Sequence, residues 1–283
     1  MTSAVGAATL RPLSDAGVSP LGLGCSRVGS LGNTTPPAEV RRTVQTAFES
    51  GVTVFDTANI YGQGDSERLL GQLFGREPKA FIVTKAGYRF SLKARLAARA
   101  KPLLKPLMAA VKPQRITEAR GAVISQDFTP QALRASLEGS LKRLRRETVS
   151  GFLLHDPPPE AIGSAEVWET LAALKTEGKA ERVGASIQTL ADLETIADNA
   201  VCEFIQAPLD VLLDNADHPA YRRFAARGGS IFVRQVLQPP GGGPRAPGTP
   251  GERVRMALAL PAVACVVVGT SRIDHLRELL ASV

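Results

Sequence analysis

Residues 53–74 read TVFDTANIYGQGDSERLLGQLF, and the rest of the chain is organised around this segment. It opens with an apolar, β-branched run that is typical of a strand buried on both faces, and the run stops at the charged Asp56. Tyr61 follows in the next loop, and Asp65 or Ser66 is then expected to cap a helix whose leucines recur at helical spacing. Because ligands bind at the carboxyl ends of strands in α/β proteins, this carboxylate and this phenol are well placed for chemistry.

The same strand-to-helix pattern recurs along the chain. Strict alternation requires parallel strands with right-handed crossovers, which predicts an α/β fold, a (β/α)8 TIM barrel. A doubly wound open sheet is the alternative, but no Gly-x-Gly-x-x-Gly turn follows the first strand to support it. We expect strands near residues 20–24, 52–56, 80–84, 151–154, 182–186, 202–206, 230–233 and 265–268, and helices at 37–50, 66–74, 130–145, 163–177, 190–199, 217–227, 252–260 and 273–282.

Three segments depart from the alternation. Residues 9–13 and 18–23 flank a turn and predict an N-terminal β-hairpin. Long connections follow two strands, namely an insertion at 87–128 after the third strand and a Gly/Pro-rich loop at 237–252. With 283 residues, the whole chain (1–283) fits a single barrel domain.

The 87–128 insertion carries leucines at helical spacing, but its prolines limit any helix to short pieces. We expect a partly helical lid, with a solvated loop as the alternative. Tyr88 and Phe90 lie nearest the strand end and are candidates to line the pocket.

The composition limits the classes of partner and the cell compartment that we expect. The formal charge of +7 is concentrated in residues 91–120, where eight Lys and Arg face one acidic residue, so the sequence argues against binding of nucleic acid or lipid by the whole molecule. No window approaches the ~20 apolar residues of a membrane span, and residues 1–10 lack the basic segment of a secretory signal. The three distant cysteines indicate neither disulfides nor a metal site. We expect a cytoplasmic protein.

Four polar residues are predicted at one end of the barrel: Asp56 ends the second strand, Tyr61 lies in its loop, Lys85 ends the third strand and His155 ends the fourth. Each alone has a simpler explanation, as a helix cap, a solvated loop charge or a strand end. Neighbouring strands lie about 5 Å apart, so the four side chains can converge on one point. Together they indicate a catalytic site.

The set suggests proton transfer to a carbonyl oxygen. A tyrosine with an ordinary pKa of about 10 holds its proton at neutral pH and can donate it beside a positive charge, which Lys85 would supply. Asp56 would keep that ammonium ionised, and His155 could orient the substrate oxygen. None of these residues can deliver a hydride, so a nicotinamide cofactor is implied.

At these residues the chain resembles the aldo-keto reductase family. The motif Asp56-Thr57-Ala58-x-x-Tyr61-Gly62, then Lys85 after Ile-Val-Thr, then Leu-Leu-His155-Asp156-Pro157, is similar to the family's tetrad in order and approximate spacing. The resemblance implies a barrel that binds NADPH, with Tyr61 as general acid and base. It also assigns Ser186 and Gln206 to the nicotinamide carboxamide, and the segment from Arg234 to Gln238 to the central part of the cofactor.

A second cofactor segment follows the last strand. Gly269, Thr270, Ser271 and Arg272 precede the final helix, where free N–H groups and the positive helix end suit a phosphate. The family places the adenosine 2′-phosphate here, with His275 adding a donor and Glu278 facing the adenine, so we expect NADPH/NADP+, with NADH possible. A helix start merely capped by Ser271 is also compatible with this segment.

Three departures from the family pattern affect the expected site. Ile187 stands where the family often has Asn, which removes a donor to the carboxamide, and Leu209 stands where it has an aromatic residue. The chain ends at Val283 directly after the eighth helix, so we expect an open substrate pocket or one roofed by the 87–128 insertion.

The leading hypothesis is an NADP-dependent oxidoreductase that reduces a small aldehyde, ketone or sugar carbonyl, or oxidises the corresponding alcohol. An NADPH-binding regulator or sensor with little turnover is the alternative, although the retained Tyr61 and Lys85 count against it. A third possibility is a phosphate-binding isomerase, which would need no cofactor. Substrate identity, direction and oligomeric state do not follow from the sequence.

Overall fold

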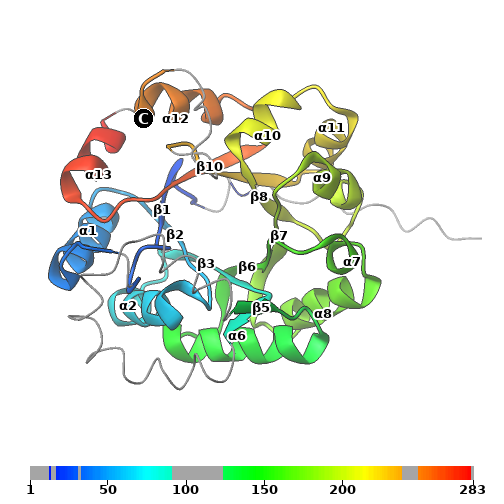
Figure 1. Ribbon diagram of the computed structural model, residues 1–283, viewed down its shortest axis with the longest axis horizontal. Coiled ribbons are helices and arrows are strands. Elements are labelled where there is room, and N and C mark those ends of the chain that lie inside the picture. Colours follow the sequence, from blue (N-terminus) through cyan, green and yellow to red (C-terminus); the bar gives the residue numbers. More distant parts are fainter. Residues whose placement is uncertain (1–12, 14–16, 31–32, 91–123, 238–247, 282–283) are drawn as a thin grey trace, which may run out of the picture.

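The computed structural model describes residues 13, 17–30, 33–90, 124–237 and 248–281. Eight parallel strands form a closed barrel in the order β1-β10-β9-β8-β7-β6-β3-β2 (Figure 1). Pairing of Leu21 with Val266 joins the first strand to the last, so the (β/α)8 barrel is confirmed and the open sheet is wrong. The strands are β1 (Leu21–Gly24), β2 (Val54–Asp56), β3 (Phe81–Ala86), β6 (Val149–His155), β7 (Ala180–Ser186), β8 (Phe204–Pro208), β9 (Ser230–Arg234) and β10 (Val263–Val268).

Helices surround the strands as an outer ring (Figure 1). The eight expected helices are α1 (Pro37–Glu49), α2 (Asp65–Phe74), α6 (Pro130–Leu144), α8 (Ala165–Thr176), α9 (Leu190–Ile196), α11 (Pro219–Ala226), α12 (Pro250–Leu258) and α13 (Ile273–Leu280). Three short helices were not expected: η2 (Tyr61–Gln63), α7 (Pro159–Ile162) and α10 (Leu209–Asp214). No helix in the described ranges is both long and apolar enough to cross a membrane.

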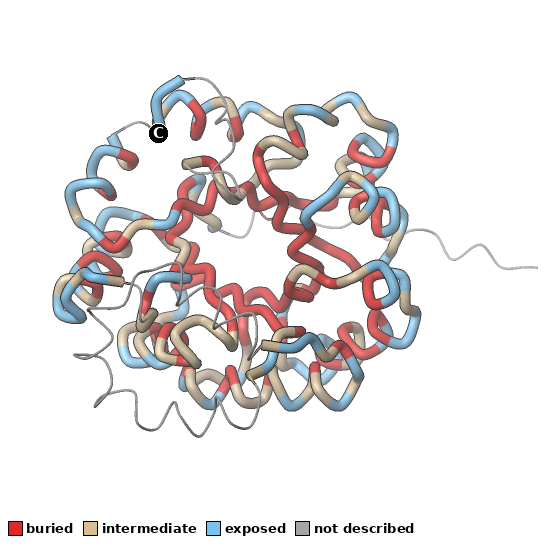
Figure 2. The backbone as a smooth tube through the Cα atoms, viewed as in Figure 1, coloured by how far each residue is buried: buried red, intermediate tan, exposed pale blue. Residues whose placement is uncertain are grey.

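Apolar side chains fill the barrel on both sides of its wall. The larger buried cluster lies between strands and helices, and Figure 2 shows the strands as an almost continuous buried ring. A second cluster fills the interior, where the rings of Phe204 and Phe232 lie 5.4 Å apart. Its members alternate along their strands, as the two-residue period of a strand requires.

This alternation places the polar residues of the site. Residues two positions apart in a strand point to the same face, so each interior apolar residue is followed by an inward residue one layer nearer the carboxyl end. The interior positions Val54, Val83, Leu153 and Phe204 are followed in this way by Asp56, Lys85, His155 and Gln206.

An antiparallel pair that the sequence did not predict lies at the base of the insertion. β4 (Tyr88–Phe90) pairs with β5 (Ile124–Gln126), and Phe90 is the partner of Ile124. Most of the predicted lid (87–128) and all of the basic segment (91–120) fall on residues 91–123, outside the described residues. The same is true of residues 9–12 of the predicted N-terminal hairpin and of Gln238.

The predicted cap of α2 was wrong. The residue at the cap position is Gly64, with a φ of 87°, so neither Asp65 nor Ser66 occupies the cap. The hydroxyl of Ser66 instead donates to the Cys25 carbonyl and lies 2.7 Å from the Thr57 hydroxyl. The serine therefore fastens the helix to the ends of β1 and β2.

Candidate active site

A buried ion pair lies at the carboxyl end of the barrel. The Nζ atom of Lys85 lies 2.6 and 2.8 Å from the two carboxylate oxygens of Asp56 and donates to the Thr57 carbonyl at 3.0 Å. Lys85 is 1% exposed and Asp56 is 6% exposed. Burial, the largest single influence, acts to lower the pKa of Lys85, but Asp56 and Tyr61 together outweigh it and the pKa is raised. The lysine therefore keeps its charge inside the barrel.

Tyr61 lies beside this pair in η2. The Nζ atom of Lys85 lies 5.1 Å from the centroid of the Tyr61 ring. Burial raises the pKa of Tyr61, and the Lys85 charge acts against that rise. A phenol in this setting is protonated at neutral pH and lies next to a cation that can stabilise a phenolate.

The turn that carries Tyr61 requires glycine at position 62. Gly62 has a φ of 58°, and a Cβ atom there would lie 2.6 Å from the Val28 carbonyl oxygen. The chain after Tyr61 therefore packs directly against the loop after β1, which fixes the position of the tyrosine.

His155 joins the cluster through ring contacts. Its ring meets those of Tyr61 and Tyr88 edge to face, with centroids 5.7 and 4.9 Å apart. Burial, with smaller effects from Lys85 and Arg234, lowers the pKa of His155 well below its ordinary value, so the imidazole is neutral at neutral pH. Its buried Nδ1 atom has no hydrogen-bond partner among the described residues.

Gln206 reaches the ion pair from across the barrel. Its amide nitrogen donates to the Oδ1 atom of Asp56 at 2.5 Å, an orientation that the carboxylate acceptor requires. The other end of the amide, Oε1, is buried without a partner in the part of the chain that the structure describes. This leaves an acceptor available to a ligand.

Asp156 links the ends of three strands. Its Oδ1 atom accepts from the Ser186 hydroxyl at 3.2 Å and from the Arg234 guanidinium at 3.3 Å. Arg234 also donates to the Ile187 carbonyl at 2.7 Å, while its buried Nε has no described partner. Sequence reasoning missed Asp156 as a site residue, although its place directly after His155 at a strand end is a signal that could have found it.

The predicted phosphate segment lies after β10, and its described residues make no hydrogen bond or ion pair to this cluster. Arg272, His275 and Glu278 are exposed, whereas Ser271 is buried and its hydroxyl lies 2.9 Å from that of Thr35. A cap by Ser271 is wrong, because α13 is preceded by Arg272 and has no side-chain cap hydrogen bond. Gly269 and Thr270 precede these residues in the same turn, in which the Thr270 hydroxyl accepts from the Arg272 N–H.

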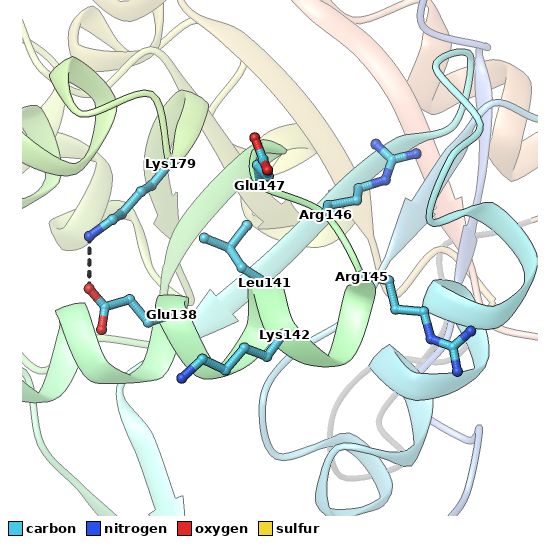
Figure 3. A pocket seen from close by; sticks show the side chains of 7 residues that line it. All are labelled: Glu138, Leu141, Lys142, Arg145, Arg146, Glu147 and Lys179. Atoms are coloured by element: carbon cyan, nitrogen blue, oxygen red, sulfur yellow. Dashed lines mark hydrogen bonds and ion pairs between the residues drawn. The ribbon is translucent and has the colours of Figure 1, made fainter.

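A separate surface groove lies at the amino end of the barrel. Figure 3 shows it between the end of α6 and the segments before β6 and β7, with the Glu138–Lys179 ion pair at one side. The groove holds both charge signs and none of the predicted site residues. Within the described ranges, no group of His, Cys, Asp and Glu residues could hold a metal ion, and all three cysteines are free and buried.

Comparison with known proteins gives a consistent result. A model of the aldo/keto reductase family matches residues 20–228, more than half of the chain. A D-threo-aldose 1-dehydrogenase of a Pseudomonas species is 28% identical over 167 residues, which cover 58% of this chain and 48% of that protein. The L-galactose dehydrogenase of Arabidopsis thaliana is 29% identical over 179 residues, which cover 62% and 47%. The chain thus spans about half the length of the curated relatives it matches.

Solved structures match over almost the whole chain. A crystal structure described as an aldo-keto reductase from Pseudomonas aeruginosa is 28% identical, with a TM-score of 0.70 over 98% of this chain and 95% of that one. An aldo/keto reductase of Klebsiella pneumoniae solved with NADP and acetate has a TM-score of 0.66 over 94% and 86%. At 18% identity, the Klebsiella protein shows likeness of fold alone.

Proposed function

Because the chain belongs to the aldo/keto reductase family, we propose that it is an oxidoreductase acting on a small aldehyde, ketone or sugar carbonyl, or on the corresponding alcohol. The observation that carries the proposal is the placement of the Lys85 ammonium, held by Asp56, 5.1 Å from the Tyr61 ring centroid. A protonated phenol beside a buried cation is the arrangement that proton transfer to a carbonyl oxygen needs.

The residues at the barrel mouth fit a nicotinamide cofactor. A carboxamide presents one acceptor and two donor hydrogens, and the buried cluster offers the unpartnered acceptor Oε1 of Gln206 and the unpartnered donor Nε of Arg234. Ser186 and Arg234 both donate to Oδ1 of Asp156, so the serine hydroxyl lies next to these groups and completes the proposed subsite. When bound, the cofactor supplies the hydride.

NADPH is the proposed cofactor, and NADH remains an alternative. Arg272 and His275 are exposed at the start of α13, where a 2′-phosphate would find a cation and free backbone N–H groups. Arg234 and the described residues after it would contact the central part of the cofactor, and Glu278 would contact the adenine. Gln238, predicted for the same role, lies outside the described residues.

Each member of the tetrad has a separate role in the proposed reaction. Tyr61 gives its proton to the carbonyl oxygen, or takes it back when an alcohol is oxidised. Lys85 stabilises the phenolate, and Asp56 keeps Lys85 charged. His155, neutral at working pH, donates a hydrogen bond to the same oxygen and orients it.

The test is consumption of NADPH, followed by its absorbance, with a panel of aldehydes, ketones and aldoses. The enzyme should turn over at least one of these carbonyls, and Tyr61→Phe should bind NADPH with unchanged affinity while losing turnover. Binding without turnover, with wild type and Tyr61→Phe behaving alike, would instead identify an NADPH sensor.

A further inference from the structure

The two oxygens of the Asp156 carboxylate differ in their surroundings. Oδ1 accepts hydrogen bonds from Ser186 and Arg234, as described above. Oδ2 accepts none from the described residues and lies 3.9 Å from the Nε2 atom of His155, with the side chain 22% exposed. The bonds to Oδ1 thus hold the carboxylate in place, while Oδ2 lies near His155 Nε2, the atom proposed to contact the substrate oxygen.

The backbone holds Asp156 in this orientation. Its φ of 47° lies in the left-handed region, which Asp and Asn adopt more readily than other residues with a side chain. Its N–H donates to the Ser186 carbonyl at 3.1 Å, and its own carbonyl accepts from the amide of Gln126 at 2.9 Å. The free oxygen is therefore preorganised as a hydrogen-bond acceptor.

On the basis of the proposed function, we propose that Asp156 is a specificity residue whose Oδ2 accepts a hydrogen bond from a hydroxyl on the carbon next to the reacting carbonyl. The preferred substrates would then be hydroxyaldehydes and hydroxyketones, the class to which aldoses and ketoses belong. In such a substrate the carbonyl oxygen and the oxygen of the neighbouring hydroxyl lie about one hydrogen-bond length apart. The first can accept from His155 Nε2 while the second donates to Asp156 Oδ2. A separation of 3.9 Å between Nε2 and Oδ2 suits two such adjacent oxygens.

The charge on Asp156 also selects against other substrates. A carboxylate at this position repels an anionic group next to the carbonyl. Arg234 offsets that repulsion only in part, because its guanidinium contacts Oδ1 and leaves Oδ2 toward the substrate. A plain alkyl group would cover Oδ2 without giving it a hydrogen-bond donor, which costs binding in the transition state.

The test compares matched carbonyls that differ by one hydroxyl on the carbon next to the carbonyl, glycolaldehyde with acetaldehyde and D-glyceraldehyde with 3-hydroxypropanal. Wild type should show a higher kcat/KM for the member of each pair that carries this hydroxyl. In Asp156→Asn, which keeps the shape and tolerates the left-handed backbone, an amide NH2 replaces the free acceptor. The ratio within each pair should fall by about 10- to 100-fold. Glu160→Gln, an exposed carboxylate in α7 of the same loop, is the matched control and should keep the wild-type ratio.

The outcomes separate this inference from the proposed function. Equal losses on both members of a pair, or an unchanged ratio, would overturn the role of Asp156 while carbonyl reduction stands. An unchanged ratio with weaker NADPH binding, measured by calorimetry, would assign Asp156 to the cofactor and also overturn it. A wild-type protein that reduces no member of any pair and no carbonyl of the wider panel would overturn both. Circular dichroism of Asp156→Asn excludes misfolding as the cause of a lower ratio.

Discussion

The two ends of the barrel differ in how far their buried polar groups are satisfied by hydrogen bonds. At the carboxyl end, Lys85 and Asp56 are buried as charges, while polar atoms of His155, Gln206 and Arg234 have no described partner. At the amino end, the corresponding groups are satisfied: the Arg146 guanidinium donates to the carbonyls of Phe74 and Glu77.

Other groups at the amino end follow the same rule. The Glu203 carboxylate accepts from Lys175 and from the N–H of Val183, and Arg227 donates to the carbonyls of Ala197 and Cys202. Unsatisfied buried polar atoms are costly, so a fold keeps them mainly where a ligand will supply the partner. The difference assigns chemistry to one end and stability to the other, as in other barrels of this class.

Removal of the Tyr61 hydroxyl should cause the largest loss of activity. In Tyr61→Phe the proton donor is lost and the ring remains, so kcat for carbonyl reduction should fall by roughly 10²- to 10⁴-fold. The melting temperature should stay near that of wild type. Stopped-flow measurement of NADPH oxidation checks the rate, and a variant that retains most of its turnover would show that another group donates the proton.

Asp56→Asn should have the next largest effect, about 100-fold on kcat. Reduction requires protonated Tyr61, whose pKa is raised, so the wild-type rate should be flat through neutral pH and fall only above about pH 10. Without the Asp56 carboxylate, the main influence that opposes burial is lost, so the pKa of Lys85 falls. The lysine then loses its charge as pH rises, and the rate should begin to fall at a lower pH than in wild type. Identical pH profiles for the two proteins would contradict the role of the ion pair.

Arg146→Met should affect stability and leave catalysis intact. It removes a half-buried guanidinium that satisfies two backbone carbonyls at the amino end, so the free energy of unfolding should fall by about 2 kcal/mol. Urea titration measures this loss, with Arg146→Lys as a control that keeps the charge. A marked change in kcat/KM at a temperature where the variant is folded would mean that the two ends are not independent.

Glu177→Gln should have the smallest effect. Ion pairs with Arg134 and Lys179 lower the pKa of this exposed carboxylate to about 2 from the ordinary 4.5, so its contribution to stability is present above pH 4.5 and is lost as pH falls toward 2. At neutral pH we expect the melting temperature to change by no more than about 2 °C, because exposed ion pairs contribute little. A calorimetric difference between variant and wild type that persists unchanged below pH 3 would contradict this assignment.

The barrel and the strand-end residues could be predicted because their signals are local. Each buried run stops at a polar residue, and the two-residue period of a strand puts Asp56, Lys85 and His155 on the inner face. The bond from Gln206 to Asp56 spans the barrel and depends on side-chain directions that the sequence does not encode locally. The cap of α2 was wrong because Ser66, a good capping residue, finds a partner at the end of another strand.

The antiparallel pair of β4 and β5 has a consequence for how this protein can change over time. Phe90 and Ile124 are partners, so the chain leaves the scaffold and returns to it at the same place. A segment attached in this way can be lengthened, shortened or exchanged at little entropic cost to the elements that carry the chemistry. Evolution can therefore vary the segment between β4 and β5 and leave Tyr61 where it is.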